Sequence, residues 1–215
     1  TGGENDTIFI QNAAQSPYHT VLSNGRYAFK YMDEAGNFDV LYVNVDGIDT
    51  TLPEATASGN PTEWTNKAPT ITVSALPKAS GIKAYIYQNG VNKESTSFTP
   101  TQNGTYSFMV TDEIGNSSTY KVVVDHVDLN APTMTINTQN VYKGNRDIFI
   151  NAGEFDKDAF EDVAASDGES GVVSSVPTIE YGAFDQNKPG KYPIYFRARD
   201  NAGNETTLTR NILVI

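Results

Sequence analysis

Residues 104–116 read GTYSFMVTDEIGN, and this stretch decides the fold because it recurs twice more in the chain. The other copies are GRYAFKYMDEAGN at residues 25–37 and GKYPIYFRARDNAGN at residues 190–204. In each copy apolar side chains recur at every second position before the Gly-Asn pair, and the alternation resumes after it. Such alternation on both sides of a short turn is typical of an antiparallel hairpin with one face on a core and the other in water. Each copy therefore predicts a β-hairpin.

The third copy differs from the other two in length. It carries two extra residues between its first glycine and its aspartate. Because side chains alternate along a strand with a period of two, an insertion of two leaves the apolar face unchanged, whereas an insertion of one would turn it outward. The exception therefore supports the strand interpretation.

The tips of the three hairpins share an Asp-x-x-Gly-Asn pattern. An aspartate that opens a turn can accept a backbone N–H two residues on, and glycine supplies the positive φ that such loops require. A rival interpretation, a metal-binding or catalytic triad of the three aspartates, requires residues about 80 to 90 positions apart on separate domains to meet in space. We therefore predict structural turns formed by Asp33, Gly36, Asn37, Asp112, Gly115, Asn116, Asp200, Gly203 and Asn204.

The repeat spacing sets the unit of folding. About 80 to 90 residues match one sandwich of about seven strands. The 12 Tyr, 10 Phe and 17 Gly of the chain, without helical heptads, also favour strands and tight turns. We predict an all-β fold of tandem immunoglobulin-like β-sandwiches, with domains at residues 1–49, 50–129 and 130–215. Only 24 residues precede Gly25, so domain 1–49 is expected to be a truncated sandwich whose open apolar face favours disorder or pairing with a neighbour.

Composition excludes several classes of function. The chain has no cysteine, and an extracellular appearance without disulfides suggests a bacterial surface. A formal net charge of −11 without a Lys/Arg cluster disfavours nucleic-acid binding. No apolar run approaches the roughly 20 residues of a membrane helix. We expect neither a nucleic-acid partner nor membrane insertion.

The pattern Gly-x-Tyr, then Asp-x-x-Gly-Asn, then a Val-rich strand resembles the tandem bacterial Ig-like repeats of Gram-positive surface and secreted proteins. The segment GNPTEWTN at residues 59–66 looks like the opening of such a repeat. Domain 130–215, with ASDGE at residues 165–169 and NKPGKY at residues 187–192, is similar to the surface Ig-like module also found in pesticidal crystal proteins. The resemblance implies stalks, adhesins, S-layer-associated proteins and accessory modules of secreted glycoside hydrolases, located outside the cell, secreted or attached to the cell wall.

The two predicted domain junctions carry matching carboxylates. DGID at residues 46–49 and DHVD at residues 125–128 are each followed by a proline seven residues after the first aspartate. Calcium prefers hard oxygen ligands from several turns and would stiffen such a joint, in loose analogy to cadherin linkers. The alternative is that these carboxylates cap turns and stay solvated, because calcium needs six or more oxygens. The candidate calcium ligands are Asp46, Asp49, Asp125, Asp128 and Asn130.

A second acidic region lies within domain 130–215. It suggests a second cation site or a partner surface, and the alternative is a solvated loop. Its members are Glu154, Asp156, Asp158, Glu161, Asp162, Asp167 and Glu169.

Other residues offer little chemistry. Trp64, the sole tryptophan, is either a stacking platform for a sugar ring or a side chain that closes the end of a sandwich. The two histidines, His19 and His126, lie in different predicted domains, and no serine elbow, zinc signature or phosphate loop accompanies them. We therefore predict no enzymatic activity, and no cofactor other than the calcium considered above.

These observations predict a non-catalytic extracellular spacer or adhesive stalk of a bacterial surface or secreted protein. Its expected partners are the neighbouring Ig-like domains of the same chain and a glycan or host surface protein. The alternative is a carbohydrate- or host-glycan-binding accessory module of a secreted glycoside hydrolase or adhesin, which aromatic side chains clustered on one exposed sheet would favour. A third possibility, a toxin fragment, depends on the resemblance of domain 130–215 alone.

Overall fold

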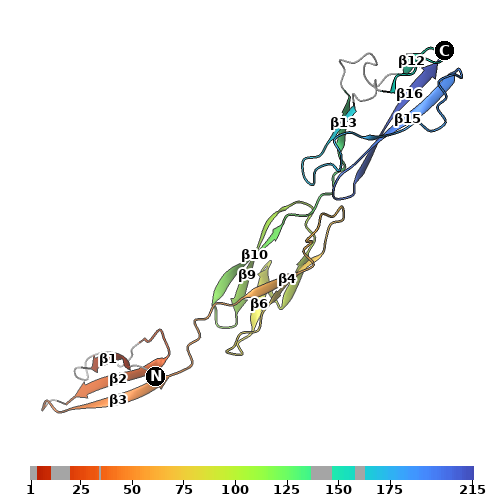
Figure 1. Cartoon of the computed structure of the whole chain (residues 1–215). Coiled ribbons are helices and arrows are strands. Elements are labelled where there is room, and N and C mark those ends of the chain that lie inside the picture. Colours follow the sequence, from red (N-terminus) through yellow and green to blue (C-terminus); the bar gives the residue numbers. More distant parts are fainter. Residues whose placement is uncertain (1–3, 11–19, 34, 137–146, 158–162) are drawn as a thin grey trace.

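The computed structural model describes residues 4–10, 20–33, 35–136, 147–157 and 163–215. These residues form sixteen β-strands and no α-helix, so the all-β prediction is confirmed. Figure 1 shows three groups of strands that follow one another along an extended chain. We name the predicted domains 1–49, 50–129 and 130–215 units 1, 2 and 3; their boundaries stay predictions.

Unit 2 consists of two facing sheets. One has the strand order β10-β9-β6-β7 and the other the order β4-β5-β8. Side chains of both sheets meet in a core, to which the central strands β5 and β6 contribute alternate residues. Full burial of one such aliphatic side chain contributes roughly 1.5–3 kcal/mol. The central core residues are Ile71, Val73, Ile86, Val110, Val122 and Val124. The strands are β4 (Ala55–Ser58), β5 (Ile71–Ala75), β6 (Ala84–Gln88), β7 (Val91–Lys93), β8 (Ser95–Phe98), β9 (Gly104–Asp112) and β10 (Ser117–Val124).

Unit 3 repeats this plan. One sheet has the order β12-β16-β15-β14, and β11 pairs with β13 in the other. In the third copy of the repeat, Ile194, Phe196 and Ala198 are buried in alternation, so the two extra residues do preserve side-chain parity. The core also contains Ile148, Ile150, Val163, Ile212 and Val214. The strands are β11 (Thr133–Ile136), β12 (Ile148–Ile150), β13 (Val163–Ser166), β14 (Thr178–Glu180), β15 (Gly190–Arg199) and β16 (Glu205–Val214).

Unit 1 is a single three-stranded sheet of β1 (Glu4–Ile10), β2 (Gly25–Met32) and β3 (Phe38–Val45). Strand β1 runs parallel to β2, and β3 is antiparallel to β2. Within the described residues of this unit no second sheet covers it, and several apolar side chains of β2 and β3 are exposed. Truncation of the unit stays a prediction.

The three hairpin tips have the same hydrogen bonds. In each, the aspartate N–H donates to the carbonyl of the asparagine four residues later, and the glycine N–H donates to the aspartate carbonyl. The glycines have φ values of 88° at Gly36, 98° at Gly115 and 96° at Gly203, a region that L side chains rarely adopt. The pattern Asp-x-x-Gly-Asn therefore specifies one local turn in three places.

The tyrosine of each Gly-x-Tyr forms a second repeated contact. Its hydroxyl donates to the carbonyl of the residue four positions earlier, and this arrangement resembles the tyrosine corner of Ig-like sandwiches. The three bonds join Tyr27 to Ser23 (2.6 Å), Tyr106 to Gln102 (2.8 Å) and Tyr192 to Lys188 (2.9 Å).

Candidate functional site at the joints between units

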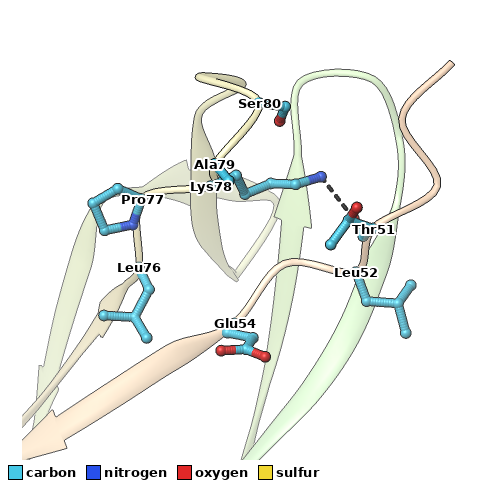
Figure 2. Close-up of a pocket in the computed structure, with 8 residues that line it drawn as sticks. All are labelled: Thr51, Leu52, Glu54, Leu76, Pro77, Lys78, Ala79 and Ser80. Carbon is cyan, nitrogen blue, oxygen red and sulfur yellow. Dashed lines mark hydrogen bonds between the residues drawn. The ribbon is translucent and has the colours of Figure 1, made fainter. Parts of the chain in front are cut away.

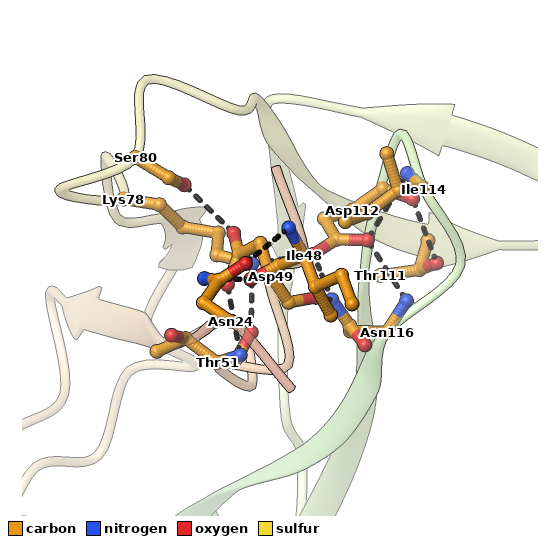
Figure 3. A network of polar contacts seen from close by, with 10 residues as sticks. All are labelled: Asn24, Ile48, Asp49, Thr51, Lys78, Ser80, Thr111, Asp112, Ile114 and Asn116. Carbon is orange, nitrogen blue, oxygen red and sulfur yellow. Dashed lines mark hydrogen bonds and ion pairs between the residues drawn. The ribbon is translucent and has the colours of Figure 1, made fainter. Parts of the chain in front are cut away.

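A buried lysine lies at the joint between units 1 and 2. Lys78, in the loop between β5 and β6, has its ammonium 2.9 Å from Asp49 Oδ2 and 2.5 Å from Asp112 Oδ2. It also donates to the carbonyl of Thr51 at 2.7 Å. The side chain of Lys78 is only 4% exposed, and that of Asp112 is fully buried. Figure 3 shows how Ser80 completes the group with a 2.8 Å bond to Asp49.

The charges of this group stabilise one another. Hydrogen bonds from Lys78 and Ser80 hold the pKa of Asp49 well below its usual range. Burial alone would raise the pKa of Asp112, but the bonds from Lys78 and Asn116 outweigh it and lower that pKa to about 2. Burial likewise opposes the charge of Lys78, yet the two carboxylates raise its pKa above the ordinary value. All three groups are therefore charged at neutral pH.

The hairpin tip of unit 2 also holds the main chain of this joint. The side-chain amide of Asn116 donates to the carbonyl of Asp49 at 2.9 Å and to Asp112 Oδ2 at 2.9 Å. On the side of unit 1, Asn24 donates to the carbonyl of Ile48 at 2.7 Å and accepts the N–H of Ile48 at 2.8 Å. The main chain of Ile48 is therefore hydrogen-bonded to unit 1, and that of Asp49 to unit 2.

The joint between units 2 and 3 repeats the same contact. Asn204, at the hairpin tip of unit 3, donates to the carbonyl of Asp128 at 3.0 Å, to that of Asn130 at 2.8 Å and to Asp200 Oδ2 at 2.7 Å. The N–H of Asp128 donates to the carbonyl of Thr65 at 3.0 Å, which belongs to unit 2. Asp128 therefore pairs with unit 2 through its main chain.

The side chain of Asp128 points instead into unit 3. Its Oδ2 accepts the N–H of Ser170 at 3.1 Å and the hydroxyl of Ser170 at 2.6 Å. Carboxylate oxygens of Asp128, Asp167 and Asp200 lie within 4.8 Å of one another. Asp128 and Asp200 are 0% and 1% exposed. The structure thus concentrates three carboxylates at this joint.

A fourth acid borders this cluster. Burial and the neighbouring Asp128 raise the pKa of Glu169, and its carboxyl also contacts Asn130. Burial would raise the pKa of Asp128 as well, but the bonds from Ser170 and the Asn130 N–H outweigh it and lower that pKa. The surroundings therefore favour the charged form of Asp128 and disfavour that of Glu169.

The predicted calcium ligands occupy different surroundings. Asp128 lies in the three-carboxylate cluster and Asn130 beside it, whereas Asp49 pairs with Lys78. Asp46 is exposed, and Asp125, 62% exposed, contacts His126 at 2.6 Å. The calcium assignment of these five residues stays a prediction. Sequence reasoning missed Lys78, and it did not connect Asp200 with the joint, because both depend on contacts between distant residues.

The acidic region of unit 3 divides in the structure. Asp167 and Glu169 lie at the joint, while Glu154 accepts a 2.7 Å bond from Asn151 elsewhere. Asp158, Glu161 and Asp162 fall outside the described residues, as does His19.

Trp64 lies at the end of unit 2 that borders the second joint, next to Thr65. It is half-buried, and its ring is 5.4 Å from that of His126 at a tilt of 56°. This position suits closure of the sandwich end, and it leaves part of the indole accessible. The two interpretations of Trp64 therefore both stay open.

A shallow hollow of about 260 Å³ lies beside the first joint. Figure 2 shows its lining, which includes Leu52, Glu54, Leu76 and Pro77, with the Lys78 ammonium directed to the carbonyl of Thr51. The lining combines apolar side chains with the carboxylate of Glu54, the ammonium of Lys78 and the hydroxyls of Thr51 and Ser80.

Comparisons with known proteins agree with the fold of unit 3. Residues 141–214 match the family described as "Bacterial surface protein, Ig-like domain". The expected resemblance to Ig-like surface modules is confirmed for this part of the chain. No curated protein matches the sequence. No helix in the described part of the chain has the length and apolar character needed to cross a membrane.

Three of the solved structures that match the chain are distant likenesses. One is the M60 catalytic domain with two CBM51 domains from Clostridium perfringens ZmpB, at 18% identity and a TM-score of 0.26, covering 80% of this chain and 17% of that one. Protocadherin gamma B2 domains 3–6 give 12% identity and a TM-score of 0.31 over 87% of this chain and 56% of theirs. Protocadherin gammaB7 domains 3–6 give 13% identity and a TM-score of 0.30 over 88% of this chain and 56% of theirs. The chain spans less than two thirds of each, and we draw nothing from these likenesses.

Proposed function

We propose that this chain is a non-catalytic, extracellular Ig-like spacer or adhesive stalk of a bacterial surface or secreted protein. Its role is mechanical, because it sets the distance between an attachment point and a target. Its partners are then the neighbouring Ig-like units of the same chain and a surface glycan or host protein.

One observation carries this proposal: each joint is held by the hairpin tip of the unit that follows it. Asn116 donates to Asp49 and Asn204 donates to Asp128, in both cases to the main-chain carbonyl. The segments that lead into units 2 and 3 are thereby attached beside the hairpin tips of those units, which leaves successive units end to end with short linkers. A stalk needs this arrangement, whereas an enzyme needs a cleft.

The second joint supports the same proposal. The main chain of Asp128 bonds to Thr65 of unit 2, and its side chain bonds to Ser170 of unit 3. One residue thus connects both units, and Val127 and Asp128 are almost completely buried there. A joint of this kind limits bending between the units.

Small-angle X-ray scattering tests the extended shape. A strand of ten residues spans about 33 Å, so three units end to end give a length of about 100 Å and a radius of gyration near 29 Å. A compact domain of this chain length would have a radius of gyration of about 17 Å. We expect a value close to the higher figure, and a value near 17 Å would refute the spacer.

The alternative function is a carbohydrate-binding accessory module. Exposed aromatic side chains on one sheet would favour it, and in unit 1 Phe38 and Tyr42 are 62% and 45% exposed. Lys30 and Arg26 lie over these two rings at 3.7 and 3.8 Å, however, so a sugar that stacked on the same face would have to displace a cation.

A binding screen separates the two functions. The chain is tested against cell-wall and plant polysaccharides and host glycoproteins, with calcium and with chelator. Saturable binding to one glycan that is lost in Trp64→Ala or Tyr42→Ala would establish a recognition module. Under the spacer proposal, neither substitution should change how the chain behaves in the glycan screen.

A further inference from the structure

The second joint contains buried negative charge without a matching positive group. Asp128, Asp167 and Asp200 bring carboxylate oxygens within 4.8 Å of one another. Among the described residues no lysine, arginine or histidine forms an ion pair with any of the three. Buried charges are costly to remove from water unless an opposite charge accompanies them.

The first joint shows what occupies the corresponding place in unit 2. Asp49 and Asp128 each precede a proline by four residues, and Asp112 and Asp200 each open a hairpin tip. The ammonium of Lys78 is bound between Asp49 and Asp112, with a third oxygen from the carbonyl of Thr51 (Figure 3). The equivalent carboxylates at the first joint therefore already bind a cation, which is supplied by the chain itself.

A serine in each unit allows the loop around Lys78 to be aligned with the loop after β13. Ser80 donates its hydroxyl to Asp49 Oδ2 at 2.8 Å, and Ser170 donates its hydroxyl to Asp128 Oδ2 at 2.6 Å. Each serine is followed by a glycine with positive φ, 78° at Gly81 and 75° at Gly171. The loop PKASG of residues 77–81 thus corresponds to DGESG of residues 167–171.

This alignment shows a coordinated exchange of charge. Gly168 stands where unit 2 has Lys78, so the internal cation is missing from unit 3. On either side, Asp167 and Glu169 replace a proline and an alanine. Compared with the loop of unit 2, this loop has one positive group fewer and two more carboxylates that can bind a metal ion.

We propose that the joint between units 2 and 3 binds a divalent cation, Ca²⁺, in the position that the Lys78 ammonium occupies in unit 2. Asp128, Asp167 and Asp200 are its primary ligands, with Glu169 and Asn130 completing the set. Five side chains with up to two oxygens from each carboxylate can reach the six to eight oxygens that Ca²⁺ takes. Asp167 Oδ2 accepts no hydrogen bond among the described residues, so this oxygen remains for the metal.

Calcium would fasten two units at once. Asp128 and Asn130 come from the joint, Asp167 and Glu169 from the loop after β13, and Asp200 from the tip between β15 and β16. Because the main chain of Asp128 is bonded to Thr65, a metal on its side chain connects unit 2 with unit 3. The consequence for stiffness rests on the proposed spacer function, whereas the binding of calcium does not.

Isothermal titration calorimetry of CaCl₂ into the whole chain, stripped with chelator, tests the site. Extracellular calcium modules have Kd values of about 10⁻⁴–10⁻³ M, and we expect one site in this range. Asp167→Asn and Glu169→Gln should each weaken binding about tenfold or more. Asp125→Asn is the matched control, because this exposed carboxylate lies outside the cluster, and it should leave the Kd unchanged.

Gly168→Lys is the decisive variant. Gly168 has no positive φ, and a Cβ built on it meets nothing within 4 Å, so a side chain fits. The new ammonium should take the place of the metal, abolish calcium binding and leave unit 3 as stable in chelator as the wild type is in calcium. Magnesium, which demands six ligands in near-octahedral geometry, should bind more weakly than calcium.

The results that overturn the proposal are equally definite. Absence of calcium binding by the wild type at millimolar concentration refutes the site. Binding that persists unchanged in both Asp167→Asn and Gly168→Lys places the metal elsewhere and also refutes it. Neither result affects the radius of gyration or the glycan screen, which test the spacer separately.

Discussion

The contact between hairpin tip and joint can be broken with one substitution, Asn204→Ala. The side-chain amide of Asn204 reaches two carbonyls, those of Asp128 and Asn130, and one carboxylate oxygen of Asp200. A neutral hydrogen bond contributes about 1 kcal/mol and one to a charged group about 1.5–3 kcal/mol. Since one NH₂ group has only two hydrogens, we expect a loss of about 3 kcal/mol in the free energy of unfolding of unit 3.

Asn116 and Asn37 provide a graded series for this prediction. Asn116 donates to one carbonyl and one carboxylate, and Asn37 donates only to Asp33, at 2.8 Å on an exposed tip. The cost of substitution by alanine should therefore be lowest for Asn37 and about equal for Asn116 and Asn204. Each local turn keeps its backbone bonds in all three variants, so the series isolates the contact with the joint.

Differential scanning calorimetry in chelator measures the effect, with hydrogen exchange to assign each transition to a unit. For a domain of this size 1 kcal/mol corresponds to roughly 4–8 °C, so Asn204→Ala should lower the melting temperature of unit 3 by about 15 °C. If the decrease is no larger than that caused by Asn37→Ala in unit 1, the hairpin tip does not hold the joint and the reasoning fails.

Three further predictions concern unit 2. Gly59→Ala should lower the free energy of unfolding by about 2 kcal/mol, because φ is +84° and the new Cβ would collide with the carbonyl oxygen of Thr70, which leads into β5. Urea denaturation measures this loss. The control is Gly47→Ala, which should be nearly neutral because a Cβ there meets nothing within 4 Å. Tyr106→Phe should cost about 1 kcal/mol in the same assay through loss of its 2.8 Å bond, and no change would exclude a stabilising tyrosine corner. The lowered pKa of Asp112, about 2, means that stability is present above the unfolded value near 4 and is lost as pH falls toward 2. Lys78→Met should reduce this pH dependence of the urea midpoint, and an unchanged profile would contradict the ion pair.

The local structure could be predicted from the sequence because its causes are local. The hairpin tips depend on residues within four positions of one another, such as Asp112 and Asn116, and strand parity depends on a period of two. The same period of two predicted that the two-residue insertion in the third copy would leave its buried face unchanged. Such signals need no knowledge of the rest of the fold.

The joints were harder to predict because they depend on distant residues. Lys78 lies 34 positions from Asp112, and Asn204 lies 76 from Asp128, so no periodicity links them. The carboxylates at both junctions were recognisable, but their neighbours were not. A comparison of the two loops aligned on Ser80-Gly81 and Ser170-Gly171 is the signal that could have found both sites.

The two joints solve one electrostatic problem in different ways. Each brings a joint aspartate beside a hairpin-tip aspartate, because the tip that binds the main chain of the joint necessarily brings its own carboxylate. Unit 2 neutralises this pair with Lys78, so its joint needs no added cation at neutral pH. In unit 3 the lysine is absent and oxygen donors replace it, so under our proposal the joint depends on calcium in the surroundings. The chain would then contain a first joint that is stable without calcium and a second joint that requires it. The stiffness of the stalk would therefore depend on the calcium concentration outside the cell.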